Sequence, residues 1–211
     1  MTYSRVHALA YQELRPGYPD LTMSWIRAQF HTGAPNILEV GCGPGNFTID
    51  ATVKLAPWRS YHAIDASPAM IERIRARCPA STPTLGRAEA LPLEPGSVDV
   101  LICPSSFHQF DQPKALAEFR RVLVARGSLL LLWNQVGHSL ASSVTSARTT
   151  AIRNVAQDAS WFYRGELHVT FTHHLPDSDL HLSDTCLRSL PPGPVHTVEY
   201  TSRAYSFESK V

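Results

Sequence analysis

The sequence predicts an α/β fold in which a doubly wound, mainly parallel sheet lies between two layers of helices, as a three-layer α/β/α sandwich. Short apolar runs alternate with helical patterns between residues 36 and 133, which is typical of repeated strand–helix–strand units with right-handed crossovers. The first apolar run leads into a glycine-rich turn at 41–45 that opens a helix. In doubly wound sheets such a turn lies at the carboxyl end of a strand, where ligands bind.

Each element of this sheet has a local signal. Apolar runs that suit buried strands predict strands at 36–40, 60–64, 84–85, 99–103 and 128–133. Apolar residues at helical spacing predict helices at 21–30, 46–55, 68–77 and from 112 onward. Pro68 and Pro113 fall in the first turns of their helices, where a missing N–H costs little. Asp111 can cap the last of these helices, and Gly127 is expected to end it.

The pattern after this core is weaker. Residues 139–160 are a moderate helix candidate, and alternating apolar side chains predict strands near 167–171 and 198–200. Three prolines and a glycine predict a loop at 190–194.

Composition and charge limit the classes of function. The chain has 211 residues, of which 44% are hydrophobic and 18% are charged, so it is long enough for one domain with a sizeable core. The net charge is +1 and no long basic or acidic run occurs. This pattern argues against a nucleic-acid footprint or a polybasic membrane anchor and favours a small-molecule substrate.

Cysteine usage and the apolar segments indicate where the protein works. Four cysteines are scattered without Cys-x-x-Cys spacing, as in a reduced chain. The amino terminus lacks the apolar core of a signal peptide, and no apolar run approaches the length of a membrane span. We therefore expect a cytoplasmic protein that does not contact a membrane.

The turn after the first strand is typical of a nucleoside-binding site. Gly41, Gly43 and Gly45 alternate in it, so backbone amides can approach a ligand closely. Asp65 follows about 20 residues later, near the end of the second apolar run, where doubly wound sheets use an acid to bind ribose hydroxyls.

Residues around this turn distinguish between nucleoside ligands. A dinucleotide fingerprint needs its third glycine where this chain has Asn46, and Pro44 removes one amide from a pyrophosphate cradle. Glu39, near the end of the first strand, would repel phosphates and suits a ligand with an ammonium group. S-adenosylmethionine has an ammonium, a sulfonium and a ribose but no phosphate, so these residues favour it over NAD.

Five segments, in order, resemble the class I S-adenosylmethionine-dependent methyltransferases. Residues 37–48 match the family's first motif, 61–70 its second motif and 86–92 its adenine-side motif. Residues 97–110 and 121–134 match its fourth and fifth strands with their loops. Three segments resemble a small-molecule branch that includes relatives of trans-aconitate methyltransferases: 11–19, 107–111 and 132–134. The resemblance implies a Rossmann-like fold and methyl transfer from S-adenosylmethionine to a small-molecule acceptor by in-line displacement.

The resemblance also implies which residues bind the cofactor. Glu39 is expected near the methionine ammonium, the three glycines around the methionine part, and Asp65 on the ribose hydroxyls. Further contacts are expected beside the adenosine or after the fourth strand, from Ala66, Met70, Ala88, Glu89 and Ser105. Plainer alternatives are that Glu39 faces solvent at a strand end and that Asp65 caps the next helix. Arg87 stands where many relatives carry a short polar residue, and it cannot accept from the adenine amino group.

A second set of residues is expected around the acceptor. They are Tyr11, Arg15, Tyr18, Phe107 and His108. His108 is the best candidate for a catalytic base, because its unperturbed pKa is about 6.5, and Arg15 suits a carboxylate. The alternatives are that His108 packs and hydrogen-bonds to backbone, and that the N-terminal residues form a surface cap.

Four histidines lie close together in the C-terminal third of the sequence, at His168, His173, His174 and His181. Their spacing fits no metal-ligand template, so no metal site is expected.

The end of the chain departs from the family. The fold usually closes with a sixth and a seventh strand, and little sequence follows Asn134 to hold both a substrate cap and these strands. A sheet that lacks the closing strands, in a truncated, fragmentary or variant chain, is therefore one expectation. The uncovered edge of the fifth strand would then favour a homodimer.

This arrangement predicts two regions and leaves two alternative functions. Residues 1–134 are expected to form the cofactor-binding core with an N-terminal cap, and 135–211 the substrate cap and C-terminal region of the same domain. One alternative is a catalytically silent methyltransferase-like protein or fragment that binds cofactor or a partner without turnover. The other, an NAD-dependent oxidoreductase, is disfavoured by Asn46 and Pro44.

Overall fold

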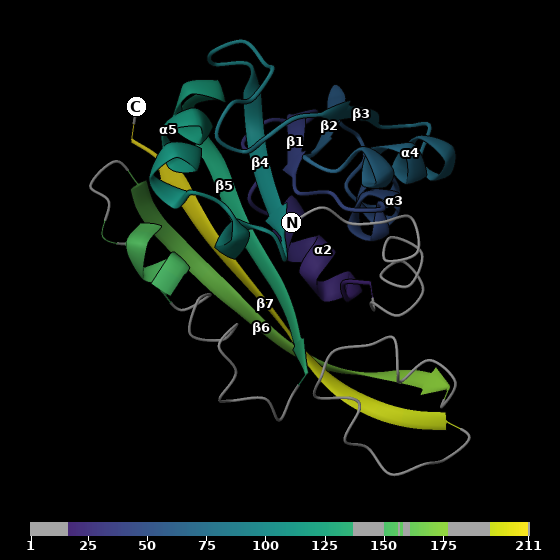
Figure 1. The fold of residues 1–211 in the computed structure, drawn as a ribbon. Coiled ribbons are helices and arrows are strands. Elements are labelled where there is room, and N and C mark those ends of the chain that lie inside the picture. The colour runs from purple at the N-terminus through teal and green to yellow at the C-terminus, as the bar shows by residue number, and fades with distance from the viewer. Residues whose placement is uncertain (1–16, 137–149, 156, 158–160, 177–194, 211) are drawn as a thin grey trace.

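A seven-stranded sheet organises the protein in a computed structural model, which describes residues 17–136, 150–155, 157, 161–176 and 195–210 (Figure 1). The strand order is β3-β2-β1-β4-β5-β7-β6. Strands β1 to β5 are parallel, and β7 is antiparallel to both β5 and β6. The strands are β1 (Asn36–Val40), β2 (Ser60–Asp65), β3 (Thr82–Leu85), β4 (Val98–Pro104), β5 (Leu123–Val136), β6 (Trp161–Pro176) and β7 (Val195–Ser209). The predicted doubly wound α/β fold is confirmed.

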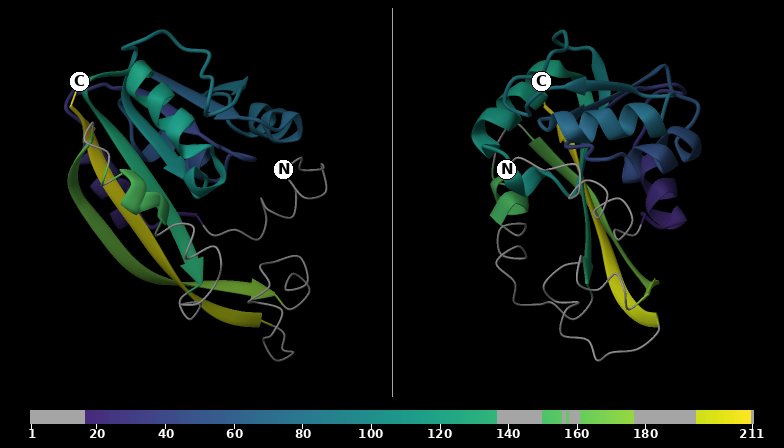
Figure 2. Two further views of the ribbon diagram at one scale, coloured as in Figure 1. Left: turned by 60° about the vertical axis from the view of Figure 1, so that its left-hand side comes forward. Right: turned by 45° about the vertical axis from the view of Figure 1, so that its right-hand side comes forward.

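Helices cover both faces of this sheet, as the views in Figure 2 show. They are α2 (Asp20–Arg27), α3 (Asn46–Lys54), α4 (Pro68–Arg77), α5 (Gln112–Val122) and the 3₁₀ helix η1 (Phe107–Gln109). The central strands bury both faces, because successive side chains point to opposite sides. Ile37 packs with α2, α3 and α4, whereas Leu38 packs with α5 and with residues of the helical segment 150–155.

The expectation that the closing strands are missing was wrong. Strand β7 pairs with β5 from Ser128↔Glu208 to Val136↔Tyr200, and β6 pairs with the far side of β7. Strand β6 is 16 residues long and β7 is 15 residues long, and in Figure 1 both ribbons continue beyond the end of β5. Because β7 covers the edge of β5, that edge no longer supports the expected homodimer.

The boundary between α5 and β5 also differs from the expectation. The helix ends at Val122, and Leu123 already has extended backbone, so Gly127 lies inside β5. A Cβ atom at Gly127 would lie 3.0 Å from the Val124 carbonyl oxygen. Glycine is therefore needed for a close backbone approach beside the irregularity in the β4–β5 register, and it does not cap the helix.

Of the predicted helix 139–160, the structure describes residues 150–155, which are helical, and residue 157. Ala151 and Val155 are fully buried there. The predicted loop at 190–194 lies outside the described residues. None of the helices among the described residues is long and apolar enough to cross a membrane.

Candidate cofactor and acceptor site

A pocket lies at the carboxyl ends of β1, β2, β4 and β5. Strands β1 and β4 are neighbours in the sheet but not in the sequence, so the pocket lies where the strand order reverses, which is the usual ligand position in doubly wound folds. The predicted site residues that line it are Tyr18, Glu39, Gly41, Gly43, Asp65, Ala66, Met70, Glu89 and Ser105.

The glycine turn requires glycine at each of its three alternating positions, for different reasons. All three have positive φ angles, of 77° at Gly41, 55° at Gly43 and 92° at Gly45. A Cβ atom at Gly41 would lie 2.3 Å from the Cβ of Ser106, and one at Gly45 would lie 3.0 Å from Ile74 Cγ1. A Cβ at Gly43 would meet nothing within 4 Å, so this residue alone presents bare backbone to open space in the pocket.

Asp65 connects the end of β2 to the glycine turn. Its Oδ2 accepts a hydrogen bond from the Gly43 N–H at 2.9 Å, and its Oδ1 accepts one from the Ser67 N–H at 2.8 Å. Burial raises the pKa of Asp65, and these backbone hydrogen bonds oppose the rise. Ser67 is the N-cap residue of α4, but its side chain makes no capping hydrogen bond. The carboxylate therefore lines the pocket and also organises both flanking turns.

Glu39 is fully buried, so the alternative of a solvent-facing acid was wrong. Its Oε2 accepts hydrogen bonds from Thr48 Oγ1 and from the Tyr61 hydroxyl, each at 2.8 Å. Its Oε1 has no hydrogen-bond partner among the described residues. Burial raises the pKa of Glu39 to about 8, although the two hydroxyl donors lower it.

This raised pKa predicts that the stability of the ligand-free protein falls as pH rises. Between pH 4.5, the ordinary pKa, and about 8, the folded protein keeps a proton on Glu39 that the unfolded chain has lost. Unfolding then releases a proton, so the free energy of unfolding falls by up to about 1.4 kcal/mol per pH unit. Urea denaturation across this range should show the fall, and Glu39→Gln should flatten it, because glutamine cannot ionise. Equal slopes for the two proteins would contradict the assignment.

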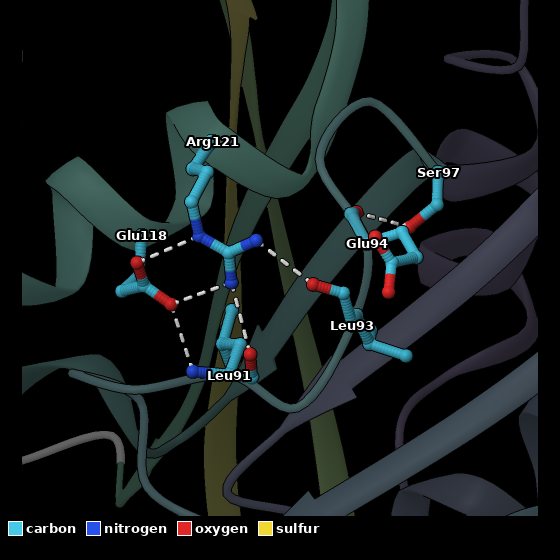
Figure 3. Close-up of polar contacts among 6 residues, drawn as sticks. All are labelled: Leu91, Leu93, Glu94, Ser97, Glu118 and Arg121. Atoms are coloured by element: carbon cyan, nitrogen blue, oxygen red, sulfur yellow. Dashed lines mark hydrogen bonds and ion pairs between the residues drawn. The ribbon is translucent and has the colours of Figure 1, made fainter.

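Arg121 and Glu118 form an ion pair on α5, and both bind the backbone of the loop after β3 (Figure 3). Arg121 donates to both carboxylate oxygens of Glu118 at 2.8 Å and to the carbonyl oxygens of Leu93 at 2.8 Å and Leu91 at 2.9 Å. Glu118 in turn accepts from the Leu91 N–H at 2.8 Å. The guanidinium fork satisfies two loop carbonyls that no regular secondary structure pairs. No sequence pattern predicts these contacts, because Arg121 and Leu91 lie about 30 residues apart.

The same loop brings Arg87 and Glu89 to the pocket and leaves Ala88 out of it. Glu89 accepts from the Asp111 N–H at 3.0 Å and pairs with Arg87 at 3.2 Å. The Arg87 side chain is 70% exposed, so it lies at the solvent edge of the pocket. The Ala88 side chain is buried in the core on the α5 side of the sheet, and Ala88 is expected to contact the adenine through its backbone amide. The prediction for its backbone amide stays a prediction.

The opposite side of the pocket is formed by the start of the described chain and the ends of β4 and β5. Tyr18 and Ser105 share a hydrogen bond of 3.0 Å between their hydroxyl oxygens, and Asn134 donates from Nδ2 to the Gly17 carbonyl at 3.1 Å. Ser105 has a φ of 52°, an uncommon left-handed conformation for a serine. Lining residues that were not predicted include Gln109, Phe110 and Asn134. Their signal was position, since Gln109 and Phe110 directly follow His108 and Asn134 lies near the carboxyl end of β5.

Two residues predicted for the acceptor pocket lie elsewhere. Phe107 is fully buried and packs against Phe110 and Phe119, so it belongs to the core. His108 does not line the pocket, and its Nδ1 accepts a hydrogen bond from Trp133 Nε1 at 3.1 Å. The geometry therefore favours the packed, hydrogen-bonded alternative for His108 over a catalytic base.

Other predicted residues fall outside the described ones. Tyr11 and Arg15 precede residue 17, and His181 lies in 177–194. His168, His173 and His174 lie on β6. Within the described ranges, no group of three or more His, Cys, Asp or Glu side chains is arranged to hold a metal ion.

Comparison with known proteins agrees with this geometry. The family described as "Methyltransferase domain" matches residues 38–131. An uncharacterized methyltransferase-like protein of Schizosaccharomyces pombe is 36% identical over 125 residues, which cover 59% of this chain and 48% of the relative. An uncharacterized methyltransferase of Mycobacterium tuberculosis is 34% identical over 125 residues, with 59% and 49% coverage. The chain thus spans about half the length of these curated relatives.

A solved structure extends the likeness to the whole fold. The structure of a SAM-dependent methyltransferase from Aquifex aeolicus superposes with a TM-score of 0.62 at 12% identity, covering 98% of this chain and 99% of that one. The trans-aconitate branch is not distinguished by these comparisons. The matched segment makes residues 38–131 similar to the methyltransferase domain family, and the strand order and the pocket agree with the class I S-adenosylmethionine-dependent methyltransferases, whose cofactor is S-adenosylmethionine.

Proposed function

We propose that this protein transfers a methyl group from S-adenosylmethionine to a small-molecule acceptor. The observation that carries the proposal is the pairing of two acids in one pocket. The buried carboxyl group of Glu39 and the carboxylate of Asp65 both line it, together with the bare backbone of Gly43. A ligand that is cationic at one end, carries vicinal hydroxyls and lacks phosphate fits these groups.

The residues of the pocket fit the cofactor in separate parts. Glu39 has an oxygen without a partner among the described residues, which suits the methionine ammonium. Gly43 allows close approach of the chain to the methionine part. Asp65 would accept from the ribose hydroxyls through the remaining lone pairs of its oxygens. Ala66 and Met70 would pack beside the adenosine, with Glu89 at the adenine end.

When bound, S-adenosylmethionine supplies an electrophilic methyl group on a sulfonium, which an acceptor nucleophile takes by in-line displacement. The chain's own contribution is orientation, which can lower a barrier by about 7–11 kcal/mol in the best cases. Tyr18, Gln109, Phe110 and Asn134 would bind and orient the acceptor, because they line the same pocket, and Ser105, expected to contact the cofactor, shares a hydrogen bond with Tyr18. Polar neutral groups there would fix the acceptor without competing for the methyl group.

Several finer assignments are part of this proposal. Residues 135–211, which include β6 and β7, would hold the substrate cap and the C-terminal region of the same domain, with Tyr11 and Arg15 on the acceptor. A base is needed only if the acceptor must lose a proton of high pKa. His108, the residue expected in that role, lies outside the pocket and accepts from Trp133 Nε1, so the proposal assigns no base. Free thiols at Cys42, Cys78 and Cys103 support a reducing, cytoplasmic location. The net charge of +1 supports a protein without membrane or nucleic-acid partners. A homodimer stays a proposal without support from the sheet edge.

Calorimetric titration with S-adenosylmethionine and S-adenosylhomocysteine tests the proposal first. We expect micromolar binding of both, and weaker or undetectable binding of NAD. An acceptor screen that follows S-adenosylhomocysteine release then tests turnover. A folded protein that binds NAD more tightly than S-adenosylmethionine would overturn the proposal. Cofactor binding without turnover on any acceptor class would favour the silent alternative.

A further inference from the structure

The hydrogen bonds of Glu39 are distributed unequally between its two carboxylate oxygens. Oε2 receives both hydroxyl donors, from Thr48 and Tyr61 at 2.8 Å each, and Oε1 receives none from the described residues. The side chain is completely buried, where an unpartnered carboxylate oxygen is costly. Because Glu39 lines the pocket, a ligand donor is the simplest partner for this oxygen.

The two donors come from different elements and are themselves fixed by the core. Thr48 lies in the first turn of α3 and is fully buried. Tyr61 lies on β2 opposite Ile37 of β1, is 1% exposed, and has its ring 6.0 Å from that of Trp58. Neither Thr48 nor Tyr61 lines the pocket, so neither is placed to touch a ligand. Their arrangement can act on the ligand only through Glu39.

We propose that Thr48 and Tyr61 are positioning residues that hold Glu39 with Oε1 available to the ammonium group of S-adenosylmethionine. The inference rests on the proposed function. Two donors on one oxygen restrict rotation of the carboxyl group and stabilise its negative charge inside the core. A protonated Glu39 would lose the ion pair, so these hydroxyls decide over which pH range the ammonium is bound well. Through Glu39, the two hydroxyls therefore determine how tightly the amino-acid end of the cofactor is bound.

Binding of two matched ligands to three variants tests this role. S-adenosylhomocysteine carries the ammonium, whereas 5′-methylthioadenosine keeps the nucleoside and the sulfur but lacks the amino-acid end. For Tyr61→Phe and Thr48→Val we expect about tenfold weaker binding of S-adenosylhomocysteine near pH 7 and unchanged binding of 5′-methylthioadenosine. The pH midpoint of S-adenosylhomocysteine binding should also move upward, because loss of a donor makes Glu39 harder to ionise.

Thr52→Val is the matched control. Thr52 lies one turn further along α3 and is buried, but its hydroxyl donates to the Ile49 carbonyl and contacts Cys78 Sγ, away from Glu39. This variant should bind both ligands as the wild type does, with an unchanged pH midpoint. If Tyr61→Phe does not fold, Thr48→Val removes a donor from the same oxygen with a smaller change in volume.

The outcomes separate this inference from the proposed function. If the wild type binds both ligands and both variants leave the affinity ratio and the pH midpoint unchanged, the positioning role is overturned alone. Equal weakening of both ligands also overturns it, since that result indicates a general structural effect. A folded wild type that binds neither ligand would overturn the proposed function and this inference together.

Discussion

Replacement of Gly41 by alanine is expected to destabilise the protein by about 2–5 kcal/mol and to abolish cofactor binding. The added Cβ would lie 2.3 Å from Ser106 Cβ and 2.8 Å from Ser106 Oγ. Ser106 cannot move freely, because it is buried and its hydroxyl donates to the Val40 carbonyl at 2.6 Å. Overpacking costs about 1–3 kcal/mol, and the φ of 77° adds about 1–2 kcal/mol for a residue with a Cβ. Urea denaturation and calorimetric titration measure the two effects.

Two other glycines supply the controls for this experiment. Gly43 and Gly96 have similar φ angles, of 55° and 61°, and a Cβ at either position would meet nothing within 4 Å. Both alanine variants should therefore fold with a small loss of stability. Only Gly43 lines the pocket, so Gly43→Ala should weaken S-adenosylhomocysteine binding and Gly96→Ala should not. If Gly41→Ala is as stable as the wild type, the turn can relax around the added Cβ, and the predicted steric clash with Ser106 is wrong.

Replacement of Asp65 by alanine is expected to weaken binding of S-adenosylhomocysteine by about ten- to hundredfold. Hydrogen bonds to a charged group contribute about 1.5–3 kcal/mol, and each 1.4 kcal/mol is a factor of ten in affinity. The substitution also removes the acceptors for the Gly43 and Ser67 N–H groups, which loosens the walls of the pocket. Because the ribose is common to both ligands, 5′-methylthioadenosine should lose affinity as well. This result contrasts with that expected for Tyr61→Phe.

Asp99→Ala is the matched control for Asp65→Ala. Asp99 also accepts a hydrogen bond from a backbone N–H, that of Asn36 at 2.7 Å, but it lies near the start of β4, away from the pocket. The variant should lose some stability with this hydrogen bond and keep wild-type affinity for both ligands. Unchanged affinity in Asp65→Ala would refute the ribose assignment.

The parts of the fold that sequence reasoning predicted have local causes. The turn at 41–45 needs positive φ angles, and only glycine adopts them without strain, so its position could be read directly. Asp111 caps α5 by accepting from the Lys114 N–H, and Pro68 lies in the first turn of α4, as the spacing predicted. These signals lie within a few residues of the structure they determine.

The predictions that were wrong depended on residues far apart in the sequence. The sheet was expected to lack its closing strands because little sequence follows Asn134, although alternation near 167–171 and 198–200 had predicted strands there. Strand β7 pairs with β5, which lies about 70 residues earlier, and no local pattern indicates that pairing. Phe107 and Phe110 both pack against Phe119, but Phe107 is fully buried in the core whereas Phe110 also lines the pocket. A helical or strand period does not distinguish these two side chains in so short a segment.

The sequence by itself determined the doubly wound class, the glycine turn and the preference for a nucleoside ligand without phosphate. These follow from backbone conformation and strand–helix alternation, which act over short distances along the chain. Only the tertiary structure decided that Thr48 and Tyr61 share one oxygen of Glu39, that Arg121 holds the loop after β3, and that His108 faces Trp133. Such contacts join elements that are distant in sequence, and they exist only once the sheet has aligned its strands and the helices have packed against it.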